Sequence, residues 1–163
     1  MPVEVMPVHA PILETRTLHW PDEAACATWA AALANHAELR NAFITLHGPL
    51  GAGKTTFVRH LLRALGVQGR IKSPTYAVVE QHSAPGLAIA HFDFYRFDDA
   101  REWEDAGFRD VFAAPGLKLA EWPEKADGVL PLPDLALTLE PQDDDIRLVT
   151  AHAHTPRGVA LLA

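Results

Sequence analysis

The spacing of apolar residues in the first half of the chain predicts a buried strand followed directly by an amphipathic helix. Residues 42–48 read AFITLHG, a short apolar run rich in strand-forming residues that stops at a glycine. Residues 54–66 place apolar side chains three and four positions apart and end at Gly66, a favourable residue at a helix C-terminus. The alanine-rich residues 21–37 predict another helix, with Pro21 in its first turn.

The second half of the chain reads mainly as strands. Five are predicted, at residues 75–82, 86–94, 116–122, 134–140 and 146–153. Turn residues separate the first two and the last two, so each of these pairs predicts an antiparallel hairpin. Residues 98–107 predict a short polar helix, and the proline-rich residues 1–15 an extended arm or an edge strand. We therefore expect one α/β domain over residues 1–163, with helices flanking a mixed, mostly parallel sheet and with antiparallel hairpins.

Composition narrows the class of protein. The 163 residues carry a net charge of -7 and no cluster of lysine or arginine, so we expect any link to nucleic acid to run through a partner. The single cysteine, Cys26, excludes an internal disulfide and fits a reducing cytoplasm. No apolar run is long enough to span a membrane, and the first residues show no secretory pattern. We expect a cytoplasmic protein.

The segment between the first strand and its helix carries the clearest chemical signal. Residues 47–60 read HGPLGAGKTTFVRH and fit the P-loop pattern G-x-x-x-x-G-K-[ST], in the strand-to-helix context that the pattern requires. Glycines let successive backbone N–H groups turn towards a polyphosphate, and the helix N-terminus adds its positive dipole end. The residues expected around the phosphates are Pro49, Leu50, Gly51, Ala52, Gly53, Lys54, Thr55 and Thr56. Lys54 would reach the β- and γ-phosphates and Thr55 would ligate Mg²⁺, while Thr56 either touches the α-phosphate or simply starts the helix.

Two carboxylates end predicted strands, where a P-loop protein is expected to hold its metal. Asp93 closes the run LAIAHFD and Glu121 closes LKLAE. Strand ends beside a P-loop strand would place both acids at the carboxyl edge of the sheet, where ligand sites of α/β folds form. The sequence does not decide which acid ligates Mg²⁺ directly.

Other polar residues give weaker signals. His91 shares a strand face with Asp93, but a lone strand histidine is more often structural. Trp122 either stacks on a partner or covers the core. The segment SPTY, residues 73–76, is on its own more typical of a turn than of a switch loop. The histidines show no spacing typical of a metal site.

Five segments together resemble a known family. They read GPLGAGKTTFVRHLLRALG, IKSPTYAVVE, HFDFYRF, AGFRDVF and LAEWPEK, in this order. From about Phe43 to about Val149 the chain is similar to the bacterial TsaE (YjeE) family, the P-loop ATPases of tRNA threonylcarbamoyladenosine biosynthesis. The resemblance implies binding and hydrolysis of ATP with Mg²⁺. It also implies work on a complex of TsaB-like and TsaD-like proteins, with tRNA reached only through them. Because the sequence shows no obvious arginine finger, we expect hydrolysis to be slow alone and faster once a partner completes the site.

The resemblance also implies residue roles. Lys54 would hold phosphate, Thr55 and Glu121 would ligate Mg²⁺, and Asp93 would be needed for hydrolysis. By the same resemblance, the nucleotide site would also include Ser73 and Thr75 of the family's switch segment, Trp122 after the metal-site glutamate, and Arg147 near the base. Pro49 departs from the acidic residue common in the family and lacks one backbone N–H.

Two alternatives stay open on the sequence. A small-molecule kinase also uses a P-loop and a strand-end acid, but it usually has several arginines on a closing lid, and no lid-like insertion is visible. A nucleotide-controlled binding module would use the same site without useful hydrolysis. The guanine-binding pattern N-K-x-D does not occur, which favours adenine.

Overall fold

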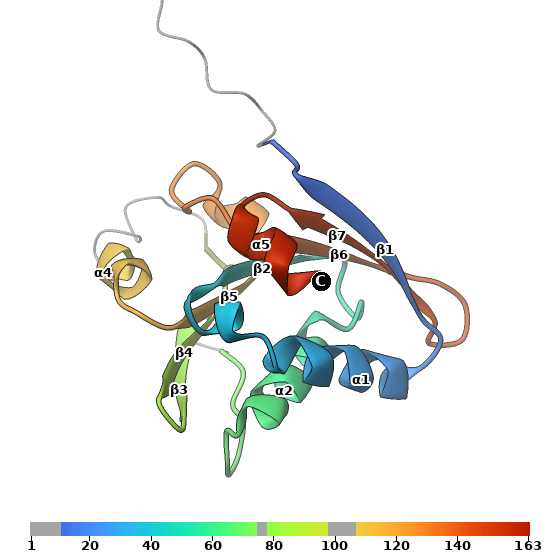
Figure 1. The fold of residues 1–163 in the computed structure, drawn as a ribbon, viewed down its shortest axis with the longest axis horizontal. Helices are drawn as coiled ribbons and strands as arrows, with labels where there is room; N and C mark the ends of the chain where they lie inside the picture. Colours follow the sequence, from blue (N-terminus) through green and yellow to red (C-terminus); the bar gives the residue numbers. More distant parts are fainter. Residues whose placement is uncertain (1–10, 75–77, 98–106) are drawn as a thin grey trace, which may run out of the picture.

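A seven-stranded sheet forms the centre of the molecule (Figure 1). The computed structural model describes residues 11–74, 78–97 and 107–163. The strands are β1 (Glu14–Trp20), β2 (Phe43–His47), β3 (Val79–Ala84), β4 (Leu87–Asp93), β5 (Leu117–Glu121), β6 (Leu135–Pro141) and β7 (Arg147–Ala153). The helices in these ranges are α1 (Glu23–Ala34), α2 (Lys54–Leu65), α4 (Phe108–Ala113) and α5 (Pro156–Leu161), with 3-10 turns η1 (Ala37–Asn41) and η2 (Pro123–Ala126).

The strand order is β1-β7-β6-β2-β5-β4-β3. Among the described strands, the three pairings in the centre are parallel, β6 with β2, β2 with β5 and β5 with β4. The three outer pairings are antiparallel, because the hairpins β3–β4 and β6–β7 sit at the two ends and β1 adds to the second. The mixed sheet and both predicted hairpins are confirmed, and parallel pairing is confined to the middle, a smaller share than predicted.

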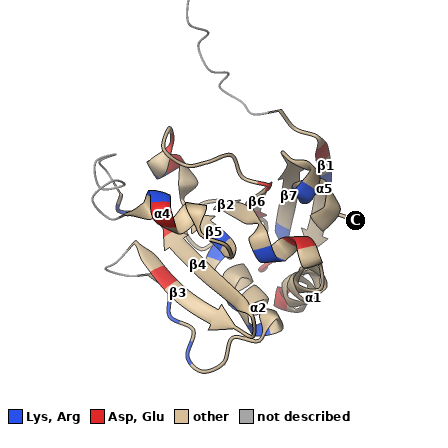
Figure 2. Ribbon diagram, turned by 60° about the vertical axis from the view of Figure 1, so that its left-hand side comes forward, with Lys and Arg blue, Asp and Glu red and all other residues tan. Residues whose placement is uncertain are grey.

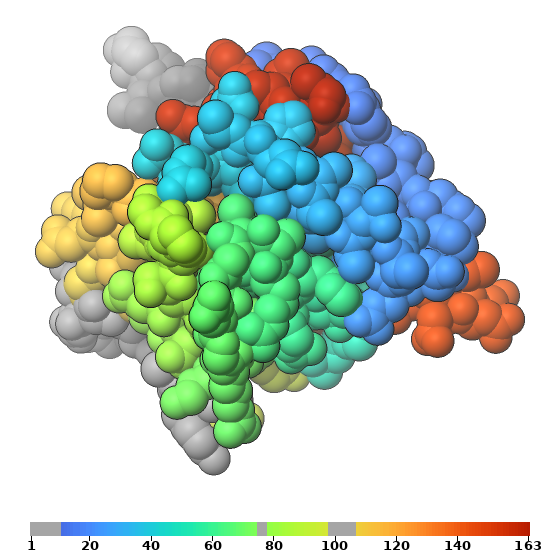
Figure 3. Space-filling model, turned by 60° about the horizontal axis from the view of Figure 1, so that its bottom comes forward, coloured from blue at the N-terminus to red at the C-terminus, as the bar shows by residue number. Residues whose placement is uncertain are grey.

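Alternating side chains of the strands divide the core into two layers. On one face, residues such as Ile44, Leu119 and Leu137 pack in one cluster with α1, α2 and the end of α5. On the other face, Phe43 and Phe92 pack in a second cluster with the aromatic residues of α4. Figure 3 shows α1 and α2 lying side by side on the first face. The P-loop helix α2 is therefore packed against both the sheet and its neighbour α1.

The two predicted helices of the first half are confirmed, with shifted starts or ends. Asp22, not Pro21, begins the first one, because its side chain caps α1 by accepting from the backbone N–H of Ala25 at 2.9 Å. The helix ends at Ala34, and residues up to Asn41 continue as η1. In α2 the apolar stripe is buried as predicted, and Gly66 ends the helix in a left-handed conformation with φ 102°.

The remaining predicted elements match the structure less closely. The edge strand predicted within residues 1–15 begins only at Glu14 and runs to Trp20, and residues 1–10 lie outside the described part. The helix expected at 98–107 falls almost wholly on residues 98–106, also outside the description, so it stays a prediction. Helices α4 and α5 were not predicted, because six residues are too few to show a helical period.

Charged residues of both signs are spread over the described surface (Figure 2). In the view of Figure 2, lysine and arginine positions are scattered among acidic ones over several elements. None of the helices in the described ranges is long and apolar enough to cross a membrane.

Two histidines are expected to make the fold less stable in acid. Burial lowers the pKa of His47 and of His82, so the unfolded chain binds more protons than the folded chain below the ordinary histidine value of about 6.5. The free energy of unfolding should therefore fall from about pH 7 to about pH 5. Denaturant unfolding at a series of pH values should show a weaker fall in His82→Gln. The exposed His19→Gln serves as control, and an unchanged slope in His82→Gln would contradict the assignment.

Candidate functional site

The loop between β2 and α2 has the backbone that a phosphate cradle requires. Gly48, Gly51 and Gly53 adopt φ values of 147°, 79° and 102°. A Cβ atom at Gly48 would lie 2.6 Å from the backbone oxygen of Leu139, so a side chain cannot be accommodated there. Gly53 directly precedes α2 and leaves the helix N-terminus open towards the loop. The glycines that the sequence pattern singled out are thus needed by the backbone itself.

Lys54 is turned back onto this loop. The side chain is buried, and its Nζ donates to the backbone oxygens of Gly48 and, at 3.3 Å, of Pro49. The same ammonium lies 3.7 Å from the ring centroid of Trp122. Burial lowers the pKa of Lys54, an effect that nearby Glu121 opposes. The cation is therefore held at the mouth of the loop by groups that a phosphate could replace.

The two strand-end carboxylates are brought together by the parallel register. Asp93 of β4 lies opposite Glu121 of β5, and Glu121 lies opposite Leu46 next to the P-loop. The Thr55 hydroxyl lies 2.9 Å from Glu121 Oε1 and 3.1 Å from Oε2, and it donates its single hydrogen to one of them at a time. A hydroxyl and a carboxylate that already touch form an oxygen-donor set suited to Mg²⁺.

Asp93 differs from Glu121 in its surroundings. Its Oδ1 accepts a hydrogen bond from the backbone N–H of Tyr95 at 3.0 Å. Burial raises the pKa of Asp93, and the neighbouring Glu121 adds to this. Glu121 is buried, whereas Asp93 is half-buried and lines the same cavity. The two acids therefore differ in burial and in hydrogen-bond partners.

His91 contacts this site, although the sequence favoured a structural role for it. The ring is buried, and its Nε2 lies 2.7 Å from Glu121 Oε2. The sequence placed His91 on the strand face of Asp93, two residues away, but gave no signal for its contact with Glu121.

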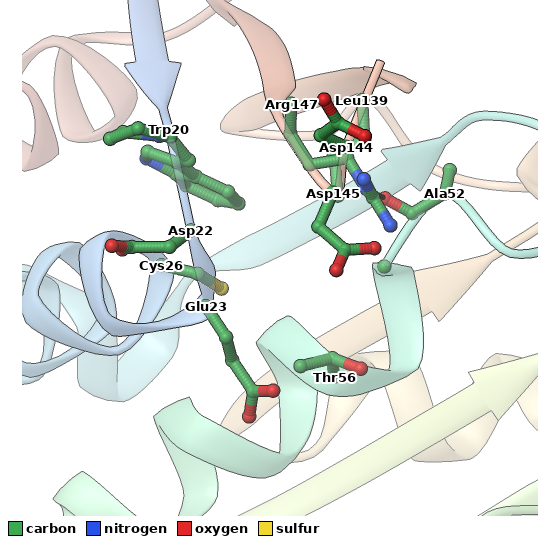
Figure 4. Close-up of a pocket in the computed structure, with 12 residues that line it drawn as sticks. Trp20, Asp22, Glu23, Cys26, Ala52, Thr56, Leu139, Asp144, Asp145 and Arg147 are labelled. Atoms are coloured by element: carbon green, nitrogen blue, oxygen red, sulfur yellow. Dashed lines mark hydrogen bonds between the residues drawn. The ribbon is translucent and has the colours of Figure 1, made fainter. Parts of the chain in front are cut away.

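Two adjoining cavities surround the P-loop. The first, about 300 Å³, lies against Lys54, Thr55, Asp93, Glu121 and Trp122. The second, about 320 Å³, is shown in Figure 4 and lies between the start of α1, the P-loop and the β6–β7 hairpin. Its walls include Trp20, Cys26, Leu139, Asp144 and Asp145. Ala52, Gly53, Thr56 and Arg147 line both cavities, so the two spaces meet at the start of α2.

Arg147 joins the terminal hairpin to the loop. Its Nε donates to the backbone oxygen of Ala52 at 2.7 Å, and its Nη2 to that of Gly51 at 3.2 Å. Both oxygens belong to the P-loop, so the Arg147 side chain ties the loop to the start of β7. Arg147, predicted near a base, lies where the two cavities meet and also fixes the loop from behind.

Most of the predicted site residues gather here. The cavity walls contain Leu50, Gly51, Ala52, Gly53, Lys54, Thr55, Thr56, Asp93, Glu121, Trp122 and Arg147. Pro49 takes part through its carbonyl, which accepts from the backbone N–H of Ala52 at 3.1 Å. Ser73 is not among the residues that line either cavity, and Thr75 lies outside the described residues.

The sequence analysis missed parts of the walls. Trp20, Asp144 and Asp145 belong to none of the quoted motif segments, and Tyr95 lies in HFDFYRF but was given no role. Cys26 is buried, and burial raises the pKa of its thiol to about 12, so it acts as a wall and not as a nucleophile.

Comparisons with known proteins agree on one family. The family model described as "Threonylcarbamoyl adenosine biosynthesis protein TsaE" matches residues 20–149. A tRNA threonylcarbamoyladenosine biosynthesis protein TsaE of Haemophilus influenzae is 39% identical over 156 residues, which are 93% of this chain and 98% of that protein. The protein of the same name from Bacillus subtilis is 33% identical over 85% of this chain and 84% of its own length.

A comparison with solved structures supports the same fold. The crystal structure of Bacillus subtilis YdiB superposes with a TM-score of 0.74 at 26% identity, over 91% of this chain and 92% of that one. The P-loop, the strand-end acids and the matched length therefore lead to one conclusion: the chain belongs to the TsaE family of threonylcarbamoyl adenosine biosynthesis proteins.

Proposed function

We propose that this protein binds and hydrolyses ATP with Mg²⁺, and that it does so in tRNA threonylcarbamoyladenosine biosynthesis by acting on a complex of TsaB-like and TsaD-like proteins. One observation carries the proposal. Lys54, Thr55, Asp93 and Glu121, which come from three separate segments, line a single cavity at the P-loop. This is the set of groups that phosphoryl transfer requires, a phosphate-binding cation, metal ligands and an acid near the attacking water.

The two cavities fit the two ends of a nucleotide. The phosphates would lie in the cavity beside Lys54, where the loop N–H groups and the N-terminus of the twelve-residue α2 provide donors. The nucleoside would lie in the second cavity, whose Trp20 and Leu139 offer apolar walls. Each cavity holds about 300 Å³, and together they reach the range typical of small-molecule sites.

The contact between Thr55 and Glu121 supports a metal-assisted reaction. Their oxygens would hold Mg²⁺, which when bound offsets the negative charge of the phosphates. Lys54 would exchange the carbonyls of Gly48 and Pro49 for phosphate oxygens. Asp93 is half-buried and its pKa is raised, which makes its carboxylate a better proton acceptor. It is therefore suited to orient a water molecule and to accept its proton.

The arrangement of arginines supports slow hydrolysis without partners. Arg147 is engaged with P-loop carbonyls, and Arg96 is exposed. In the described part of the chain, no other arginine lines the cavity beside Lys54. A cation that stabilises the γ-phosphate would then come from a partner protein, as it does for other P-loop proteins.

The test is the rate of phosphate release from Mg-ATP, measured for the chain alone and with its TsaB-like and TsaD-like proteins. We expect a low rate that rises with the pair and disappears when EDTA removes the metal. Asp93→Asn should lower the rate about 100-fold and still bind ATP, since a positioned base contributes on this order. The exposed Asp127→Asn is the matched control.

The two rival functions give different results in the same assay. A wild-type chain that binds ATP but releases no phosphate with or without the pair would be a nucleotide-controlled binding module. If the TsaB-like and TsaD-like proteins leave the rate of ATP turnover unchanged and a small acceptor molecule raises it, the protein would be a kinase. Either outcome would overturn the proposed function.

A further inference from the structure

The two oxygens of the Glu121 carboxylate are held from two sides. His91 Nε2 lies 2.7 Å from Oε2, while the Thr55 hydroxyl lies closer to Oε1, at 2.9 Å, than to Oε2, at 3.1 Å. A carboxylate only accepts hydrogen bonds, so Nε2 must carry the ring hydrogen and donate it. The Thr55 hydroxyl of α2 therefore lies within reach of both oxygens and nearer to Oε1, whereas His91 of β4 contacts Oε2.

We propose that His91 is a positioning residue, which holds Glu121 so that Oε1 stays directed at Thr55 and is available to Mg²⁺. The inference rests on the proposed function, because it assigns the residue that orients one of the two expected metal ligands. His91 itself does not touch the metal through Nε2, since that nitrogen is committed to Glu121.

Burial makes this contact important for Glu121. The side chains of His91 and Glu121 are only 1% and 3% exposed, and the His91 ring is the hydrogen-bond donor that strand β4 provides to this carboxylate. A buried carboxylate without a fixed donor would turn to whichever group offers a hydrogen bond. A rigid strand that provides the donor removes this freedom before the metal arrives.

The second ring nitrogen shows that packing alone does not explain the histidine. His91 Nδ1 is buried and has no hydrogen-bond partner among the described residues. Buried polar atoms of proteins are nearly always paired, and an unpaired one lowers stability. An apolar residue would fill this place without that loss, so the benefit of histidine lies in its contact with Glu121.

The experiment compares variants that keep or lose the donor. His91→Gln can place an amide N–H near the position of Nε2, whereas His91→Asn is one methylene too short, and His91→Met fills the space without a donor. His82→Asn is the control, because His82 lies on the same sheet face in β3 and also leaves a buried nitrogen unpaired. Each is titrated with ADP in EDTA and then with Mg²⁺ in the presence of ADP.

We expect His91→Asn and His91→Met to raise the Mg²⁺ concentration for half-saturation about 10- to 100-fold, the effect typical of losing a residue that orients a metal ligand. Their affinity for ADP in EDTA should stay that of the wild type, and His91→Gln and His82→Asn should keep the wild-type Mg²⁺ requirement. If one of the variants His91→Asn and His91→Met does not fold, the other is sufficient for the test.

Two results would overturn the inference while leaving the proposed function intact. One is an unchanged Mg²⁺ requirement in a folded donor-free variant, and the other is an equal loss of ADP affinity with and without metal, which indicates a merely structural role. A wild-type chain that binds no ADP, or binds it without regard to Mg²⁺, would instead overturn the proposed function together with this inference.

Discussion

Lys54→Met is expected to remove nearly all ATP hydrolysis, with kcat/KM at least about 100- to 1,000-fold lower. This is the scale measured when one preorganised donor to developing charge is lost, and here the same group also binds the ground-state phosphates. The fold should lose little stability, because burial already disfavours the charged form of Lys54 and methionine leaves an apolar side chain beside Trp122. The measurements are phosphate release, ATP binding and the thermal unfolding midpoint.

Lys125→Met is the matched control, since Lys125 is exposed on η2 and lines neither cavity. Its hydrolysis should equal that of the wild type. A Lys54→Met protein that is folded and hydrolyses ATP normally would refute the P-loop assignment. A thermal unfolding midpoint of Lys54→Met below the assay temperature would show that the variant is unfolded. A loss of activity in such a variant would not support the P-loop assignment.

Gly158→Ala is expected to destabilise the fold by about 3 kcal/mol or more, although helix propensity predicts a gain of about 1 kcal/mol for alanine. A Cβ atom at Gly158 would lie 1.9 Å from the backbone oxygen of Asp134. Asp134 cannot move easily, because its side chain accepts from the backbone N–H of Phe43 at 2.8 Å and from the Thr155 hydroxyl at 2.6 Å. The clash would therefore disturb the start of both β6 and β2.

Denaturant unfolding of Gly158→Ala measures this loss. Gly69→Ala isolates the effect of backbone conformation, because Gly69 has φ 76° and no atom within 4 Å of the added Cβ. That control should lose only about 1–2 kcal/mol, the cost of a left-handed conformation. A Gly158→Ala protein as stable as the wild type would show that α5 can shift away from Asp134.

The sequence predicted the strand, P-loop and helix of residues 42–66 because these features are local. An apolar run, a glycine at each turn of the loop and a helical apolar stripe each depend on neighbours a few positions away. The carboxylates were found for the same reason, since each ends an apolar strand. Where boundaries were missed, as at Pro21, a side-chain cap decided the first residue of the helix.

His91 marks the limit of such local reasoning. The sequence placed it on the face of Asp93, but a strand pattern does not say which residue of another strand lies beside it. The register of β4 against β5 sets the contact with Glu121, thirty positions away in the sequence. Free energy from pairing and packing over the whole sheet fixes that register, and no local pattern encodes it.

By itself, the sequence determined the P-loop pattern with its lysine and threonine, two candidate acids and the resemblance to one family. The tertiary structure alone decided that β5 brings Glu121 to Thr55, that Arg147 reaches the P-loop carbonyls from 95 positions away, and that Gly158 must lack a side chain. The reason is physical. Backbone conformation responds to nearby residues, whereas contacts between distant segments depend on how the whole core packs.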